Sequence, residues 1–144
     1  QQIAEIAELV GLTERQTVSV ARYRQGLIEA GEKPGRIQDL VERRARALRQ
    51  QRAEVIARSE GLQAIHEGQA ERWAQSVRDG LLDATRFRRF WILGPRPCPK
   101  ICQLIPGMNP DGVGLDEPFQ TPVGPLAHPL AHPECMCGVS GGAV

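Results

Sequence analysis

The most constraining feature of this sequence is the placement of its four cysteines, which all lie in two short clusters in the last third of the chain. The first cluster reads CPKIC at residues 98–102, and the second reads HPECMC at residues 132–137. Thiolate and imidazole are ligands that zinc prefers, and a structural zinc site usually takes four of them. Two short ligand-bearing segments separated by a long loop therefore predict a structural zinc site.

Five side chains are candidates for the four ligand positions: Cys98, Cys102, His132, Cys135 and Cys137. A single residue separates Cys135 from Cys137, so an extended segment there would turn their side chains to opposite faces. In that case only one of the two would bind the metal easily, and His132 would complete the set.

Two other interpretations of the cysteines stay open. An even number of cysteines also allows disulfides. The sequence shows no signal-peptide pattern, however, and lacks the dispersed cysteine spacing of a secreted disulfide framework. Four unrelated buried thiols are the third interpretation. His128 lies close to the second cluster, but we expect it to be a solvated loop histidine.

The segment between the clusters is rich in proline: ten of the eleven prolines lie between Pro95 and Pro133. Proline removes amide donors and interrupts helices, so this segment should consist of turns and short extended pieces. Because it offers little apolar material for a core, a metal would contribute binding energy directly to folding. The small residues from Gly138 to Val144 should form a frayed tail or lead onward.

The first part of the chain has helical signals. Residues 1–11 predict a short apolar helix that ends at Gly11. Thr13 can cap the next helix, and Gln16 stands three residues later as in a capping box. Gly31 is a suitable C-terminal stop for that helix.

A long helix is predicted after Pro34, a residue that suits a first turn. The pattern stays helical to about residue 79, which would give a helix about 65 Å long if unbroken. Such a helix would either kink near Gly61 or Gly68 or project to reach another subunit. Its apolar stripe includes Val41, Leu48, Val55 and Leu62.

The stripe predicts an amphipathic core face and not a coiled coil, because Arg52, Ser59 and His66 occupy the complementary positions. We expect His66 to be a polar-face or partly buried histidine and not a ligand. Residues 87–93, FRRFWIL, predict a short strand that leads to the first cysteine cluster.

These elements predict a mainly α fold in two regions. A helical assembly region with a helical hairpin and a long helix would cover residues 1–85. A small Pro-rich region would cover residues 86–144. It would be irregular apart from a short strand, and its two cysteine clusters would form the zinc knuckles, short loops that supply the zinc ligands. Aromatic residues are only 4 % of the chain, so the helical region should have a shallow core that a partner or further chain completes. No apolar run is long enough to span a bilayer.

The net charge is only +1, but arginines cluster locally. Residues 36–58 carry seven arginines against three acidic residues, and residues 86–100 carry five basic residues and no acid. Such faces either dock on an acidic protein or follow a nucleic-acid backbone. The candidates for DNA contact are Arg43, Arg44, Arg46, Arg49, Arg88 and Arg89.

Several short motifs follow one another in a familiar order. They are GLTERQ at 11–16, IARSE at 56–60, Gly68, Trp73, the strand into Cys98, LDEPF at 115–119, and HPECMC at 132–137. This order resembles the phage head morphogenesis family, the minor head proteins similar to the F protein of phage Mu, over about residues 11–139. The chain departs from the usual motifs at Ser59, at Met136, and in one additional residue within the first cysteine cluster.

The resemblance implies a minor virion protein that is made with the portal and acts in head assembly. It would lie in the phage head, and in the host cytoplasm during assembly, as part of an oligomeric particle. Its partners would be portal and/or major capsid protein, with no membrane contact and no catalysis by this domain. The alternatives are a zinc-stabilised DNA-binding module and a metal-dependent phage nuclease, which would need a catalytic His with an Asn or Asp partner.

Overall fold

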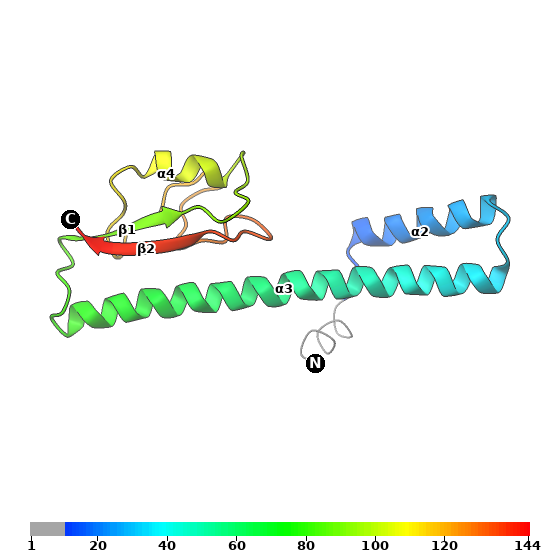
Figure 1. Cartoon of the computed structure of the whole chain (residues 1–144), viewed down its shortest axis with the longest axis horizontal. Helices are drawn as coiled ribbons and strands as arrows, with labels where there is room; N and C mark the ends of the chain where they lie inside the picture. Colours follow the sequence, from blue (N-terminus) through cyan, green and yellow to red (C-terminus); the bar gives the residue numbers. More distant parts are fainter. Residues whose placement is uncertain (1–10) are drawn as a thin grey trace. The chain divides into compact units, whose positions relative to one another are not determined.

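A computed structural model describes residues 11–144, so the helix predicted over residues 1–11 lies outside the described residues. The elements are α2 (Glu14–Glu29), α3 (Pro34–Arg78), β1 (Phe87–Ile92), the 3-10 turn η1 (Cys102–Leu104), α4 (Ile105–Met108) and β2 (Gly138–Ala143) (Figure 1). About half of the chain is helical, with one long helix and a small two-stranded sheet, which confirms the coarse fold class.

The chain divides into two compact units, Gln1–Ala57 and Arg58–Val144, here called the N-terminal and C-terminal units. The division lies within α3. The predicted boundary between residues 85 and 86 lies in the loop between α3 and β1. The C-terminal part of α3 thus belongs to the same unit as both cysteine clusters. No helix in the described part of the chain has a stretch apolar enough to cross a membrane.

Helix α2 begins and ends at the residues that the sequence indicates. The Thr13 hydroxyl accepts a hydrogen bond from the Gln16 amide, and the Gln16 side chain accepts one from the Thr13 amide, which completes a capping box. At the other end Gly31 has a φ of 76°, and the Glu32 amide donates to the Leu27 carbonyl. These bonds satisfy groups that a helix terminus leaves free.

The N-terminal unit is a helical hairpin with a thin core. Gln16 donates to the Leu48 carbonyl at 3.3 Å, and Arg52 donates to the Gly11 carbonyl at 2.5 Å, so polar side chains help to hold α2 on α3. Among residues 11–57 only Ala45 and Ala53 are buried, and α2 buries none of its residues. The shallow core expected from the composition is therefore present.

Helix α3 begins at Pro34 and continues for 45 residues through Gly61 and Gly68. In the C-terminal unit it packs beside the sheet, where the Trp73 and Phe87 rings lie 5.3 Å apart between centroids. Gln69 also donates to the Val139 carbonyl at 3.0 Å. Helix α3 thus supports the sheet that leads into and out of the cysteine region.

The expectation of a frayed C-terminal tail is wrong. Residues Gly138–Ala143 form β2, which pairs antiparallel with β1 in the register Phe87↔Ala143 to Ile92↔Gly138. Small residues are needed there because a Cβ at Gly141 would lie 2.4 Å from the Phe87 ring and 2.8 Å from Trp73. Gly141, which looks like part of a flexible tail in the sequence, allows this close packing.

The side chain of Arg89 points into the C-terminal unit and is 4 % exposed. It donates to the carbonyls of Gly114 (3.0 Å), Ala127 (2.8 Å) and Glu117, and lies over the Phe119 ring. Burial lowers the pKa of Arg89, and the nearby Asp116 and Glu117 oppose that shift. The predicted DNA contact by Arg89 is therefore wrong, because its guanidinium fastens the Pro-rich segment to β1.

We expect Arg89→Lys to lower the free energy of unfolding by about 2 kcal/mol, because an ammonium cannot reproduce a planar fork bonded to three carbonyls. Arg88 is the matched control, since it lies on the same strand, is half-exposed and pairs with Glu117 at 3.3 Å. Arg88→Lys should change the stability by less than about 0.5 kcal/mol. Urea denaturation of both variants measures the difference, and equal effects would contradict the role given to Arg89.

Candidate metal centre

Three of the five predicted ligands meet in the C-terminal unit. The sulfur atoms of Cys102, Cys135 and Cys137 all lie within 4.8 Å of one another, and those of Cys102 and Cys135 are 3.9 Å apart. Two cysteines bound to one tetrahedral zinc at the usual Zn–S length have sulfurs about 3.8 Å apart. The three cysteines could therefore bind a metal ion with little rearrangement.

The first cluster is folded by its own backbone. The Cys98 carbonyl accepts hydrogen bonds from the amides of Ile101 (3.4 Å) and Gln103 (3.1 Å), and Cys102 opens the turn η1. Just before this cluster the chain crosses the second one. A Cβ at Gly94 would lie 2.4 Å from the Met136 carbonyl oxygen. Only glycine fits this crossing, which brings the two clusters together.

The second cluster opens with a tight turn, and the residues from Cys135 to Cys137 have no regular secondary structure. The Cys135 amide donates to the His132 carbonyl at 3.2 Å, and Glu134 has a left-handed φ of 64°. Cys135 and Cys137 both join the cluster, so the irregular segment between them does not separate their sulfurs as a regular strand would. The expectation that only one of them takes part depended on that extended geometry and is not met.

His132 also reaches the cluster, since its Nε2 atom lies 2.9 Å from the Cys102 sulfur. Its Nδ1 atom lies 2.7 Å from the Pro133 carbonyl oxygen, where it can donate and leave the Nε2 lone pair free for a metal. A nitrogen and a sulfur on one tetrahedral zinc are about 3.6 Å apart. Metal binding would therefore move His132 and Cys102 slightly apart.

The ring nitrogens of His132 do not lie within 4.8 Å of all three sulfurs, so His132 is outside the three-cysteine group. Cys98 is the other predicted ligand outside that group. It is partly buried and packs against the core, whereas the other three cysteines are at most 3 % exposed. All four are free thiols in the structure. The two clusters are thus joined through Cys102, Cys135 and Cys137, with His132 beside Cys102.

The surroundings of Cys102 and Cys135 shift the pKa values of their two thiols in opposite directions. Burial raises the pKa of Cys102 to about 12, and a hydrogen bond with Cys137 acts in the same direction. Burial also opposes ionisation of Cys135, but hydrogen bonds from the backbone at Cys137, Ala131 and Leu130 outweigh it and lower the pKa of Cys135. Backbone amides directed at a sulfur stabilise thiolate, the form that binds metals.

The sulfur atoms belong to the core of the unit. The three cysteines pack with Trp91, Ile105, Val113 and Phe119, and the Trp91 and Phe119 rings meet edge-on with centroids 5.3 Å apart. An ion at this place would be shielded from water by large apolar side chains. The arrangement fits a closed site in which protein atoms fill the coordination sphere.

His66 is a neighbour of the cluster that the sequence analysis did not assign to it. It is 6 % exposed, stacks on His128 with ring centroids 5.9 Å apart, and has no hydrogen-bond partner for either ring nitrogen among the described residues. Burial lowers its pKa, His128 lowers it further, and the Cys137 backbone opposes both. Its seven-residue spacing from Ser59 places it among polar positions of the helix, so the sequence near His66 does not indicate that it is buried.

We found no family model, curated protein or solved structure that matches this chain.

We expect the full chain to bind Co²⁺ with a cobalt–thiolate charge-transfer absorption, and the Cys102→Ser variant to lose most of that absorption because it breaks the three-cysteine group. Cys98→Ser should retain most of the band, since three thiolates remain. Ultraviolet–visible titration with Co²⁺ measures both variants. Loss of the band in Cys98→Ser with retention in Cys102→Ser would contradict the geometry.

Proposed function

We propose that this chain is a minor head protein of a phage, which docks on portal or major capsid protein during head assembly and catalyses no reaction. The order of its motifs from residue 11 to 137 supports this assignment. The observation that carries the docking role is the thin core of the N-terminal unit, in which α2 buries no residue. A two-helix hairpin of this kind gains apolar burial when it binds a larger protein.

The surface of the hairpin supports docking on a protein. Val18 is 45 % exposed and Ile28 is 49 % exposed, both on α2. Each isolated apolar side chain is ordinary on a protein surface. Together with the lack of buried residues in α2, they make this helix the part of the N-terminal unit with most to gain from a partner.

We assign the metal as structural zinc. The donors are Cys102, Cys135, Cys137 and His132, a Cys₃His set of the kind that structural zinc sites use. A catalytic zinc keeps one position open for water, and the deep burial of these sulfurs favours a closed site. The ion would join residues 98–102 to residues 132–137 and hold the Pro-rich segment between them.

The environment of Asn109 also favours a structural protein over a nuclease. Its amide nitrogen donates to the carbonyls of Ile105 (2.8 Å) and Gln120 (2.9 Å), and its oxygen accepts from the Gln120 amide (2.9 Å). In a nuclease this side chain would orient the catalytic histidine. Here its nitrogen and its oxygen are both bound to backbone groups instead. It holds the Pro-rich segment together.

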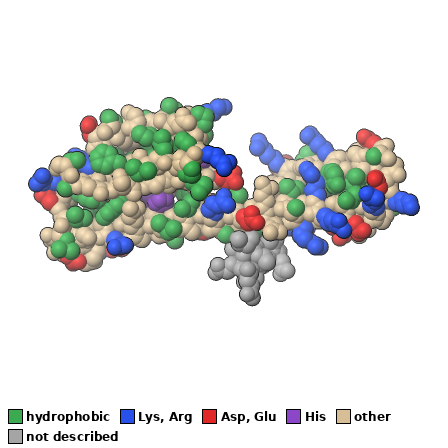
Figure 2. All heavy atoms as spheres, in the orientation of Figure 1, with side chains coloured by type: hydrophobic (Ala, Val, Ile, Leu, Met, Phe, Trp, Pro, Cys, Tyr) green, Lys and Arg blue, Asp and Glu red, His purple; other side chains and the backbone are tan. Residues whose placement is uncertain are grey.

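DNA contact is the second candidate function, and the arginines of α3 favour it. Arg43, Arg46 and Arg49 are exposed, and Arg44 lies over the Tyr23 ring at 4.9 Å. Figure 2 shows Lys and Arg side chains gathered over the N-terminal unit. A steep fall of DNA affinity with added salt would support this function, whereas no binding at moderate salt would leave protein docking.

Elemental analysis of the purified protein should find about one zinc per chain, with the thiols shielded from titration until a chelator removes the metal. Chelation should loosen residues 94–139, because the cross-link between the clusters is lost. Helices α2 and α3 should persist, so circular dichroism should retain most of the helical signal. A chain without metal and with four reactive thiols, or a helical signal that collapses on chelation, would contradict the assignment.

Val18→Asp and Ile28→Asp should each abolish co-purification with the portal or capsid protein encoded by the same phage, because a buried unpaired carboxylate is costly at an interface. Both side chains are exposed in the free chain, so thermal stability should change little. Gln51→Asp, an exposed position on α3, introduces the same charge as a control. Unchanged co-purification in both α2 variants would remove α2 from the docking surface.

A further inference from the structure

We propose that the free edge of β2 and the adjoining face of α3 form a groove that binds an extended segment of a partner protein as a third strand. The groove has a volume of about 630 Å³ and is lined by α3 residues between 64 and 76, among them Ile65, Gln69, Arg72 and Trp73. This proposal rests neither on the metal centre nor on the virion role, and it concerns a different surface from α2.

The edge of β2 presents unpaired backbone groups. Arg89 exchanges hydrogen bonds with Val113 at 2.8 and 2.9 Å, so its backbone N–H and C=O point away from β2. Gly141 lies opposite Arg89, and in an antiparallel pair its groups must then point away from β1. The backbone N–H and C=O of Ala143, two residues later, also point away from β1. Both residues are exposed, and no other described part of the chain bonds their outward groups.

The groove adjoins this edge directly. Gln69 donates to the Val139 carbonyl at 3.0 Å, so a groove residue already satisfies one outward group of β2. Trp73 approaches Gly141 so closely that a Cβ there would lie 2.8 Å from its ring. The groove itself is lined by α3 residues, and two of them, Gln69 and Trp73, contact β2, so the groove lies next to the strand. Addition of a strand beside a helix is an established mode of peptide recognition, in which main-chain bonds give affinity and side-chain pockets give specificity.

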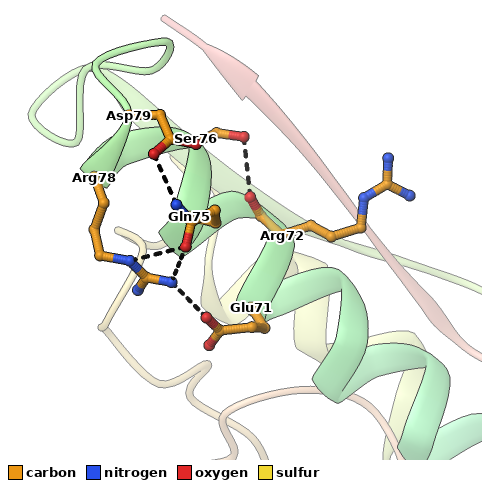
Figure 3. Close-up of polar contacts among 6 residues, drawn as sticks. All are labelled: Glu71, Arg72, Gln75, Ser76, Arg78 and Asp79. Carbon is orange, nitrogen blue, oxygen red and sulfur yellow. Dashed lines mark hydrogen bonds and ion pairs between the residues drawn. The ribbon is translucent and has the colours of Figure 1, made fainter.

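The charge in the groove indicates the partner's chemistry. Figure 3 shows the Arg72 side chain pointing away from the polar network that joins Glu71, Gln75 and Arg78. Its guanidinium has no hydrogen bond or ion pair within residues 11–144, and no acidic residue lines the groove. Ile65 adds an apolar side chain that is 64 % exposed. A complementary segment would carry apolar side chains on one face and a carboxylate that reaches Arg72.

A second copy of this chain fits the groove less well. Its own β2 strand reads GVSGGA, with no carboxylate for Arg72 and with Val139 as its one large apolar side chain. Pairing of two β2 edges would leave the charge of Arg72 and the face of Ile65 without complements. The occupant is therefore a strand from another protein.

The test uses the full chain as purified and fluorescent eight-residue peptides of alternating Val and Thr with Glu, Gln or Lys at one central position. We expect the Glu peptide to bind most tightly by fluorescence anisotropy. Ala143→Pro removes an outward N–H and leaves the β1 ladder intact, so it should weaken binding about tenfold. Ala143→Ser keeps the N–H and should bind as the unaltered chain does.

The second part of the binding test reverses the charge at Arg72. Arg72→Glu should weaken the Glu peptide and strengthen the Lys peptide, which a general loss of folding would not do. The proposal is overturned if no peptide binds at about 1 mM, if Ala143→Pro binds normally, or if the Glu and Lys peptides bind alike. It is also overturned if sedimentation shows a dimer that Ala143→Pro dissociates, since the occupant would then be a second copy.

Discussion

The C-terminal unit depends on the burial of three thiols in one small core. Cys102, Cys135 and Cys137 lie among Trp91, Ile105 and Phe119, and few other large side chains are available to the segment between residues 95 and 137. Three sulfurs this close cannot all ionise without a cation, because each thiolate raises the cost of the next. As thiols they add only a small apolar surface. The contribution of this cluster to stability would therefore increase greatly with a metal ion bound to the three cysteines.

Proline explains why so many polar side chains bind backbone around this core. Each proline removes an amide donor but keeps its carbonyl, so a segment with ten prolines has a surplus of acceptors. Side-chain donors must satisfy them. Arg89 supplies three bonds to carbonyls, and Asn109 supplies two. A buried arginine without a direct carboxylate partner is unusual, but a set of carbonyl dipoles stabilises its charge.

Local signals predicted the local structure of this chain. The cap at Thr13, the start at Pro34 and the strand from Phe87 follow from interactions within a few residues, and the structure confirms them. The inward direction of Arg89 and the pairing of Gly138–Ala143 depend on partners more than 20 residues away. The burial of His66 likewise depends on distant residues, since its ring lies against His128 and near the Cys137 backbone. The sequence contains the ligand candidates, but the spacing of Cys135 and Cys137 does not by itself show that both join Cys102.

The two units lack different interactions, and this difference indicates different kinds of partner. Within residues 11–57 most of the backbone is paired in α2 and α3 but only Ala45 and Ala53 are buried, so a partner would supply hydrophobic contact. The C-terminal unit has a closed core, yet β2 leaves main-chain donors and acceptors free at its edge, so a partner would supply hydrogen bonds in register. Hydrophobic contact tolerates sequence change better than strand pairing beside a charged side chain does. Specific recognition should therefore reside in the C-terminal unit, where a single N–H and the charge of Arg72 discriminate between partners.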